Sequence, residues 1–222
     1  MNCGVLFSGG KDSTLAALKA KQHGHNLSCL ISIFSENPES YMFHTPSISK
    51  VEKQAEIMKI PLITQKTKGE KELELKDLKK AVQMAKDIYN IKAVVTGAVE
   101  SVYQKSRIEK VCDELNLECF NPLWKLDQVE LLKDLVINNF SVVIIGVFAY
   151  PLDKTWLGRK IDESFIQEAI DLYEKYKINP AGEGGEFESF VLNCPLFTRC
   201  LKIIRKDIFG KKNSWKMELE VT

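Results

Sequence analysis

The sequence predicts an α/β fold, with a doubly wound, mostly parallel sheet followed by a smaller C-terminal α+β subdomain. Over residues 1–150, short apolar runs alternate with longer amphipathic stretches, which is typical of strand–helix–strand units. Beyond Pro151 the pattern changes to a helical stretch, a glycine-rich acidic segment and strands of alternating polarity. A chain of 222 residues suits such a domain and subdomain, with predicted bounds 1–150 and 151–222.

The predicted elements of the first part follow one another regularly. Residues 3–7 form an apolar strand that ends in Ser-Gly-Gly, and a helix follows from Asp12 to about Gly24. Further strands are expected at 27–34, 61–64, 93–96, 118–120 and 141–148, and further helices at 47–58, 74–89, 102–115 and 127–138. Because strands and helices alternate, the strands should be parallel, with helices on both faces of the sheet.

The predicted C-terminal subdomain has a different pattern. Residues 165–176 form a helix, and residues 179–189 are rich in glycine and glutamate. Residues 199–208 and 214–221 alternate apolar and polar side chains around Gly210. This alternation predicts an antiparallel hairpin.

Composition argues against several classes of protein. The 31 basic and 30 acidic residues leave a formal net charge of +1, which argues against a nucleic-acid-binding protein. Six cysteines occur without a CxxC motif, and those in apolar runs, such as Cys3 and Cys29, are expected to be small buried side chains. No apolar run approaches the roughly 20 residues of a membrane span. With no signal peptide before the first strand, we expect a cytoplasmic protein.

The clearest motif lies between the first strand and the first helix. It consists of Ser8, Gly9, Gly10, Lys11, Asp12 and Ser13. A helix N-terminus offers free N–H groups and a partial positive charge to phosphate, and glycines let the backbone approach the anion. The serine hydroxyls and the lysine add further donors. The motif is not a Walker A loop, because Val5 and Asp12 stand where that loop needs Gly and Ser or Thr.

Two further stretches contain candidate ligand-binding residues. The loop 36–46 carries Tyr41 and His44, whose rings suit an adenine or an apolar part of a substrate, unless they only anchor the loop. Gly97 follows a strand, so that a ligand can approach its backbone closely. Tyr103 and Arg107 share one helix face. The guanidinium suits a carboxylate or phosphate, and a surface salt bridge is its alternative role.

The segment 179–189 concentrates carboxylates. Glu183, Glu186 and Glu188 alternate with glycines in a stretch that has little core character. Clustered carboxylates suit a cation, either Mg²⁺ or an amine. Glu186 and Glu188 share one face if the chain is a strand through Phe187. A solvated acidic turn is the alternative interpretation.

Together these motifs resemble the diphthine–ammonia ligase family of the PP-loop, or N-type, ATP pyrophosphatases. The similar segments are residues 38–46 (PESYMFHTP), 97–124 (GAVESVYQKSRIEKVCDELNLECFNPLW), 156–159 (WLGR) and 180–189 (PAGEGGEFES). The resemblance covers essentially the whole chain. It departs at Asn179, where histidine is common in the family, and at Ser189, where threonine is common.

The resemblance implies an activity. It is the ATP-dependent amidation of diphthine on elongation factor 2 by ammonium to give diphthamide, through an acyl-adenylate, with release of pyrophosphate and AMP. ATP and Mg²⁺ are the implied cofactors, and the modified factor and ammonium are the implied partners. From the composition, we expect neither a membrane nor a nucleic acid as a partner.

We assign roles to the candidate residues as a hypothesis, in four groups. ATP binding falls to Ser8, Gly9, Gly10, Lys11, Asp12, Ser13 and Gly97. Substrate binding falls to Tyr41, His44, Tyr103 and Arg107. Catalysis falls to Glu183, Glu186 and Glu188, and Mg²⁺ binding to Asp12.

Two other functions remain open from the sequence. A tRNA-modifying PP-loop enzyme would use paired cysteines, and Cys112 and Cys119 are close enough in sequence to meet across a helix and the next strand. However, no basic, aromatic RNA-binding stripe accompanies them. A non-catalytic ATP-binding sensor would have no need of the acidic segment at 183–188.

Overall fold

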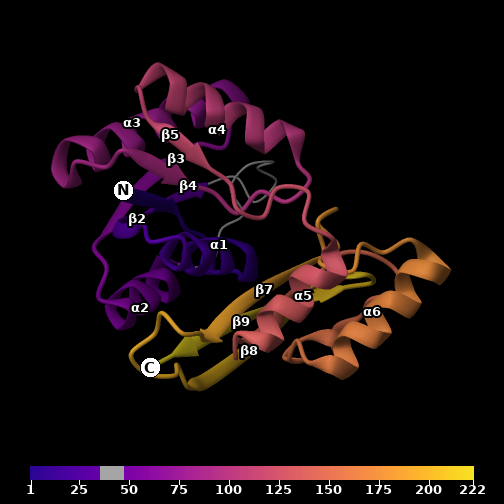
Figure 1. Cartoon of the computed structure of the whole chain (residues 1–222). Helices are drawn as coiled ribbons and strands as arrows, with labels where there is room; N and C mark the ends of the chain where they lie inside the picture. Colours follow the sequence, from indigo (N-terminus) through magenta and orange to yellow (C-terminus); the bar gives the residue numbers. More distant parts are fainter. Residues whose placement is uncertain (36–47) are drawn as a thin grey trace. The chain divides into compact units, whose positions relative to one another are not determined.

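The computed structural model describes residues 1–35 and 48–222, which fall into two compact units (Figure 1). The first unit is Met1–Trp124 and the second is Lys125–Thr222. The first unit therefore ends before the boundary near Pro151 that the sequence predicted. In the described ranges, no helix is long and apolar enough to cross a membrane.

The first unit contains a five-stranded parallel sheet with the order β3-β2-β1-β4-β5. Its strands are β1 Asn2–Leu6, β2 Asn26–Ser35, β3 Leu62–Thr67, β4 Ala93–Val95 and β5 Glu118–Phe120. Every neighbouring pair is parallel, which confirms the predicted parallel sheet. The inner strands β1, β2 and β4 are mostly apolar, as expected for strands that helices cover on both faces.

The helices of this unit lie on opposite faces of the sheet (Figure 1). Helices α1 (Lys11–Gln22) and α2 (Ile48–Met58) cover one face, and α3 (Lys71–Tyr89) and α4 (Val102–Glu114) cover the other. This arrangement confirms the doubly wound fold. In such a fold, the loops that follow the carboxyl ends of the strands gather at one edge of the sheet.

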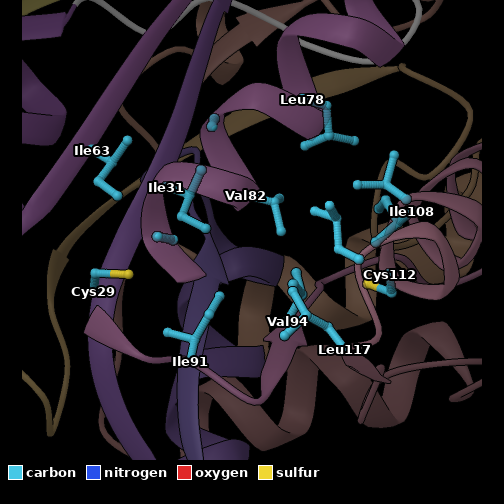
Figure 2. Packing of buried hydrophobic residues seen from close by; sticks show 14 of the residues in the cluster. Cys29, Ile31, Ile63, Leu78, Val82, Ile91, Val94, Ile108, Cys112 and Leu117 are labelled. Carbon is cyan, nitrogen blue, oxygen red and sulfur yellow. The ribbon is translucent and has the colours of Figure 1, made fainter. Parts of the chain in front are cut away.

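The core of the first unit lies beneath α3 and α4 (Figure 2). Leu78 of α3 and Ile108 of α4 meet Ile31 of β2 and Ile63 of β3 in one apolar cluster. Cys112 is part of this cluster and is buried, as Cys29 is. Burial of each large apolar side chain contributes about 1.5–3 kcal/mol, so the cluster holds both helices against the sheet.

The second unit has an antiparallel sheet with the order β7-β6-β9-β8. Its elements are α5 Gln128–Ile137, β6 Ser141–Val147, the 3₁₀ helix η1 Lys154–Trp156, α6 Glu163–Tyr176, β7 Phe187–Asn193, β8 Ile203–Lys211 and β9 Ser214–Val221. The β8–β9 pair confirms the predicted hairpin. Ring contact between Phe165 and Phe187 packs α6 against the sheet.

The sequence placed the strand at 141–148 in the parallel sheet, and this prediction is wrong. The strand is β6, which pairs antiparallel with both β7 and β9. A strand that is buried on both faces, as β6 is, is apolar throughout in either kind of sheet, so its composition does not reveal its direction. The neighbouring strand β7 begins at Phe187, inside the glycine-rich acidic segment 179–189, for which the sequence left both a strand and a turn open.

The core of the first unit provides a stability prediction. We expect Leu78→Ala to lower the free energy of unfolding by about 2–5 kcal/mol, because Leu78 is fully buried and the substitution leaves a cavity. Ile88→Ala, on the same helix, is the control, since Ile88 is 62% exposed. It should change stability by less than about 0.5 kcal/mol. Urea unfolding followed by circular dichroism measures both, and equal effects would contradict this account of the core.

Candidate active site

The Ser8–Ser13 loop joins the end of β1 to the start of α1. The first residue of α1 is Lys11, and among the described residues no side chain caps this helix end. Strands β2 and β4 flank β1 on either side, so the loop lies where the strand connections diverge. Ligands of open α/β sheets bind at this position, and the N-terminus of a helix favours an anion.

Hydrogen bonds within the loop fix its shape. The Ser8 backbone N–H donates to Oγ of Ser13 over 3.2 Å, and the two serine hydroxyl oxygens lie 3.1 Å apart. The Thr14 hydroxyl donates to the Gly10 carbonyl over 2.8 Å. Gly9 has a φ of 78°, in the left-handed region that glycine adopts without strain. These contacts and the glycine conformation define the shape of the loop.

Gln54 of α2 also holds the loop, and the sequence analysis did not identify it. Its side chain is fully buried, and Nε2 donates to the Gly9 carbonyl over 3.0 Å. Gln54 lies 45 residues from Gly9 in the chain, within a helix whose sequence shows only ordinary amphipathic periodicity. Only the packing of α2 reveals this contact.

Gly97 follows β4 and lies against the loop. A Cβ at this position would come within 2.8 Å of both the Asp12 carbonyl carbon and the Ser13 nitrogen. Real Cβ atoms essentially never approach backbone so closely. The absence of a side chain at Gly97 thus allows the end of β4 to touch the first turn of α1.

Lys11 and Asp12 bring charge to the loop. The buried Lys11 ammonium donates to Oδ2 of Asp12 over 2.8 Å. The other carboxylate oxygen, Oδ1, is buried and has no hydrogen-bond partner among the described residues. The same residues contain no cluster of three acidic, histidine or cysteine side chains able to hold a metal ion. A single carboxylate oxygen suits Mg²⁺, which is usually bound by one or two carboxylates together with substrate phosphates.

Tyr103 and Arg107 meet on α4, as their spacing predicted. Arg107 Cζ lies 3.5 Å from the centroid of the Tyr103 ring. The described residues give Arg107 no ion pair; Glu109 instead pairs with Lys105 at 3.4 Å. The Tyr103 ring packs against the core cluster, and its buried hydroxyl has no hydrogen-bond partner in the described ranges. The other two predicted substrate residues, Tyr41 and His44, lie outside the described residues.

Both oxygens of the Glu186 carboxylate accept hydrogen bonds from residues of the turn that precedes β7. Oε1 accepts from the Asn179 backbone N–H over 3.1 Å and from the Asn179 side-chain amide over 2.8 Å. Oε2 accepts from the Gly184 N–H over 2.8 Å. Because β7 begins only at Phe187, Glu186 lies before the strand, whereas Glu188 lies within it opposite Gly146. Glu183 belongs to the same turn as Gly184.

Gln128 extends this network and was also missed by the sequence analysis. Its Nε2 donates to Asn179 Oδ1 over 3.3 Å, and its Oε1 accepts from the Ala181 N–H over 3.0 Å. Asp127 caps α5 by accepting from the Val129 and Glu130 N–H groups, which fixes Gln128 in the first turn. The acidic segment is therefore a turn whose conformation is held by side-chain hydrogen bonds from Gln128, Asn179 and Glu186.

The cysteines behave mainly as buried apolar side chains. Burial raises the pKa of the Cys29 thiol to about 12, so that this thiol stays protonated at neutral pH. Cys112 and Cys119 do meet, and they share a hydrogen bond. That hydrogen bond raises the pKa of Cys112 and lowers the pKa of Cys119.

Each of the two units of this chain matches a known domain family. The diphthamide synthase N-terminal domain profile matches residues 1–119, and the diphthamide synthase C-terminal domain profile matches residues 127–220. A protein from Rattus norvegicus named diphthine–ammonia ligase is 32% identical over 90% of this chain and 81% of its own length. The chain belongs to the diphthine–ammonia ligase family. The break between its two units falls between the two domain profiles.

Family members differ in length. A diphthine–ammonia ligase from Schizosaccharomyces pombe is 31% identical over 91% of this chain, but the match spans only 36% of that protein. Among solved structures, the predicted subunit of tRNA methyltransferase from Methanocaldococcus jannaschii aligns with 88% of this chain at 20% identity, with a TM-score of 0.46. That likeness is too distant to bear on function.

The contact at Gly97 predicts the effect of a methyl group. We expect Gly97→Ala to push the Asp12–Ser13 backbone out of position and to weaken ATP binding at least about tenfold, the equivalent of about 1.4 kcal/mol. Gly24→Ala is the control, since a Cβ there meets nothing within 4 Å and lies at the other end of α1. Its positive φ costs some stability but should leave the ATP dissociation constant unchanged. Equilibrium dialysis with labelled ATP measures both constants, and unaltered binding by Gly97→Ala would contradict the contact.

The network around Glu186 predicts a structural effect. In Glu186→Gln, whichever way the amide turns, its NH₂ group faces N–H donors, so we expect the second unit to lose about 1–3 kcal/mol of stability. Glu174→Gln, at an exposed site on α6, should change it by less than about 0.5 kcal/mol. Thermal unfolding measures both variants. Lost activity with unchanged stability would instead indicate a direct chemical role for Glu186.

Proposed function

We propose that this protein amidates diphthine on elongation factor 2, using ATP and ammonium, and so forms diphthamide. The observation that supports this most directly is the hydrogen-bonded loop Ser8–Ser13 at the start of α1, in which one carboxylate oxygen of Asp12 is buried. Membership of the diphthine–ammonia ligase family supplies the acceptor and the nitrogen source. Cytoplasmic location is part of the proposal, because the elongation factor works there.

The reaction has two steps. The diphthine carboxylate attacks the α-phosphorus of ATP, the bond to the β-phosphate oxygen breaks, and pyrophosphate leaves with the electron pair. Ammonia then attacks the acyl carbon, the bond to the AMP oxygen breaks, and one proton is released as the amide forms. Adenylation is needed because a carboxylate is a poor electrophile and hydroxide a poor leaving group.

The first unit supplies the phosphate chemistry. The N-terminus of α1 and the loop N–H groups hold the phosphates, and Lys11 adds a positive charge where negative charge develops. Asp12 Oδ1 would hold Mg²⁺, which would neutralise phosphate charge. Gly97 lets β4 contact the first turn of α1, which fixes the helix end that would hold the phosphates.

The remaining roles concern the acceptor. Arg107, stacked on Tyr103, offers a cation to the diphthine carboxylate. Tyr41 and His44 are proposed to contact the same substrate. Glu183 and Glu188 are proposed to attract the trimethylammonium group of diphthine or the ammonium ion, or to take up the released proton. Glu186 acts with them by holding the turn.

One experiment tests the proposal. The purified protein is incubated with ATP, Mg²⁺, ammonium chloride and elongation factor 2 that carries diphthine, and AMP, pyrophosphate and the mass of the factor are measured. We expect AMP and pyrophosphate in equal amounts, together with the small mass loss that accompanies conversion of an acid to an amide. Omission of ammonium and addition of a chelator are the controls, and each should abolish the mass change.

Other results would point elsewhere. AMP release without a change in the factor would support ATP cleavage but indicate a different acceptor. The first acceptor to test would then be tRNA, because tRNA-modifying enzymes of this type use paired cysteines and Cys112 and Cys119 are adjacent. ATP binding with no AMP, in the presence of a competent factor, would support the sensor interpretation.

A further inference from the structure

Asn121 is a buried amide that the reaction as described does not use. It follows β5 directly. Both of its side-chain atoms, Oδ1 and Nδ2, are shielded from solvent and have no hydrogen-bond partner in the described part of the chain. A buried amide without partners costs stability, so its presence in a folded protein calls for an explanation.

The position of Asn121 provides that explanation. Strand β5 pairs with β4, and the Thr96 N–H donates to the Phe120 carbonyl over 3.0 Å. The next residues of these two segments are Gly97 and Asn121. The register pairs Val95 with Phe120, so Asn121 lies beside Thr96, one residue before the Gly97 that touches the Asp12–Ser13 backbone of the phosphate loop.

Helix α4 lies next to the segment that contains Asn121. The Trp124 N–H donates to the Asn121 carbonyl over 3.3 Å, which makes residues 121–124 a tight turn. The Lys105 ammonium lies 4.5 Å from the centroid of the Trp124 ring, so the first turns of α4 pack against this turn. Arg107 and Tyr103 belong to those turns of α4. The Tyr103 hydroxyl is a second buried polar group without a described partner.

The amide specifies the chemistry of its ligand. Nδ2 donates and Oδ1 accepts, so a matching ligand must offer an acceptor and a donor side by side. The phosphates of ATP offer only acceptors. A carboxyl group with an ammonia molecule next to it offers both, and so does the carboxamide that they form. The edge of adenine also offers both, but the cations of α4 favour an anionic carboxylate over a neutral base.

We propose that Asn121 positions the two groups that are joined in the amidation. Nδ2–H donates to an oxygen of the diphthine carboxyl group, and Oδ1 accepts an N–H of the incoming ammonia. The inference rests on the proposed function and adds to it a binding position for ammonia beside the acyl carbon. Asn121 transfers no proton; it orients the nitrogen lone pair toward the carbon that it attacks.

Two substitutions and a matched control test this role. Asn121→Leu removes both polar atoms at similar volume, and Asn121→Asp removes the donor and places a negative charge toward the carboxylate. Gln83→Leu is the control, because that amide already has a partner: Gln83 Nε2 donates to Asp87 Oδ1 over 2.7 Å. For each variant we would measure the ATP dissociation constant, the KM for ammonium chloride, kcat/KM for the diphthine-bearing factor, and Tm.

We expect Asn121→Leu to raise the KM for ammonium about tenfold, the usual cost of one lost hydrogen bond of this kind. Its ATP dissociation constant should stay within about twofold of that of the unaltered protein. Its Tm should be equal or higher, because the substitution removes a buried polar group that has no partner. Asn121→Asp should lower kcat/KM for the factor further than Asn121→Leu does, and Gln83→Leu should leave every kinetic constant unchanged.

Three results would overturn the inference. Weakened ATP binding would assign Asn121 to the adenine. A lower Tm, with activity falling only as the folded fraction falls, would make its role structural. Unchanged ammonium and factor kinetics in both variants would leave it no role in amidation. Failure of the proposed function would be recognised separately, because the unaltered protein would then form no amide. That result would also contradict the role of Asn121 in amidation.

Discussion

The contact of Gly97 with the backbone of Asp12 and Ser13 is the constraint on which the candidate site depends. It exists because the strand order places β4 directly beside β1, at the point where successive connections leave the sheet in opposite directions. The phosphate loop, the start of α4 and the end of β5 then all lie along one edge. A fold that separated β1 from β4 would contain the same motifs without bringing them together.

The two units differ in the buried polar atoms that have no hydrogen-bond partner among the described residues. In the first unit, Asp12 Oδ1, the Tyr103 hydroxyl and the Asn121 amide are buried without hydrogen-bond partners in the described ranges. In the second unit, Gln128, Asn179 and Glu186 satisfy one another and the backbone around them. Buried polar atoms without partners cost stability, and such atoms suit a site where a ligand supplies the missing hydrogen bonds. The satisfied network instead stabilises a turn. This contrast agrees with phosphate and acyl chemistry at the first sheet.

The sequence predicted those features that depend on neighbours in the chain. The alternation of strands and helices, the Ser8–Ser13 loop and the β8–β9 hairpin all have local patterns, and the structure confirms the loop's place between β1 and α1. The direction of β6 was missed because strand pairing is set by distant segments. Gln54 and Gln128 were missed for the same reason, since their partners lie 45 and 51 or more residues away. Asn121 carries no motif at all, and only its burial distinguishes it.

Asn179 departs from the pattern of the family that the sequence resembles. Histidine is common at this position in the family, and a neutral imidazole also carries one donor and one acceptor. The amide of Asn179 uses its donor on Glu186 and its acceptor on Gln128. A protonated imidazole would have no acceptor, and the neighbouring Glu186 carboxylate would favour that protonated form, so the link to Gln128 would depend on pH. An amide does not titrate, and in this chain the brace between α5 and the acidic turn therefore does not depend on the protonation of residue 179.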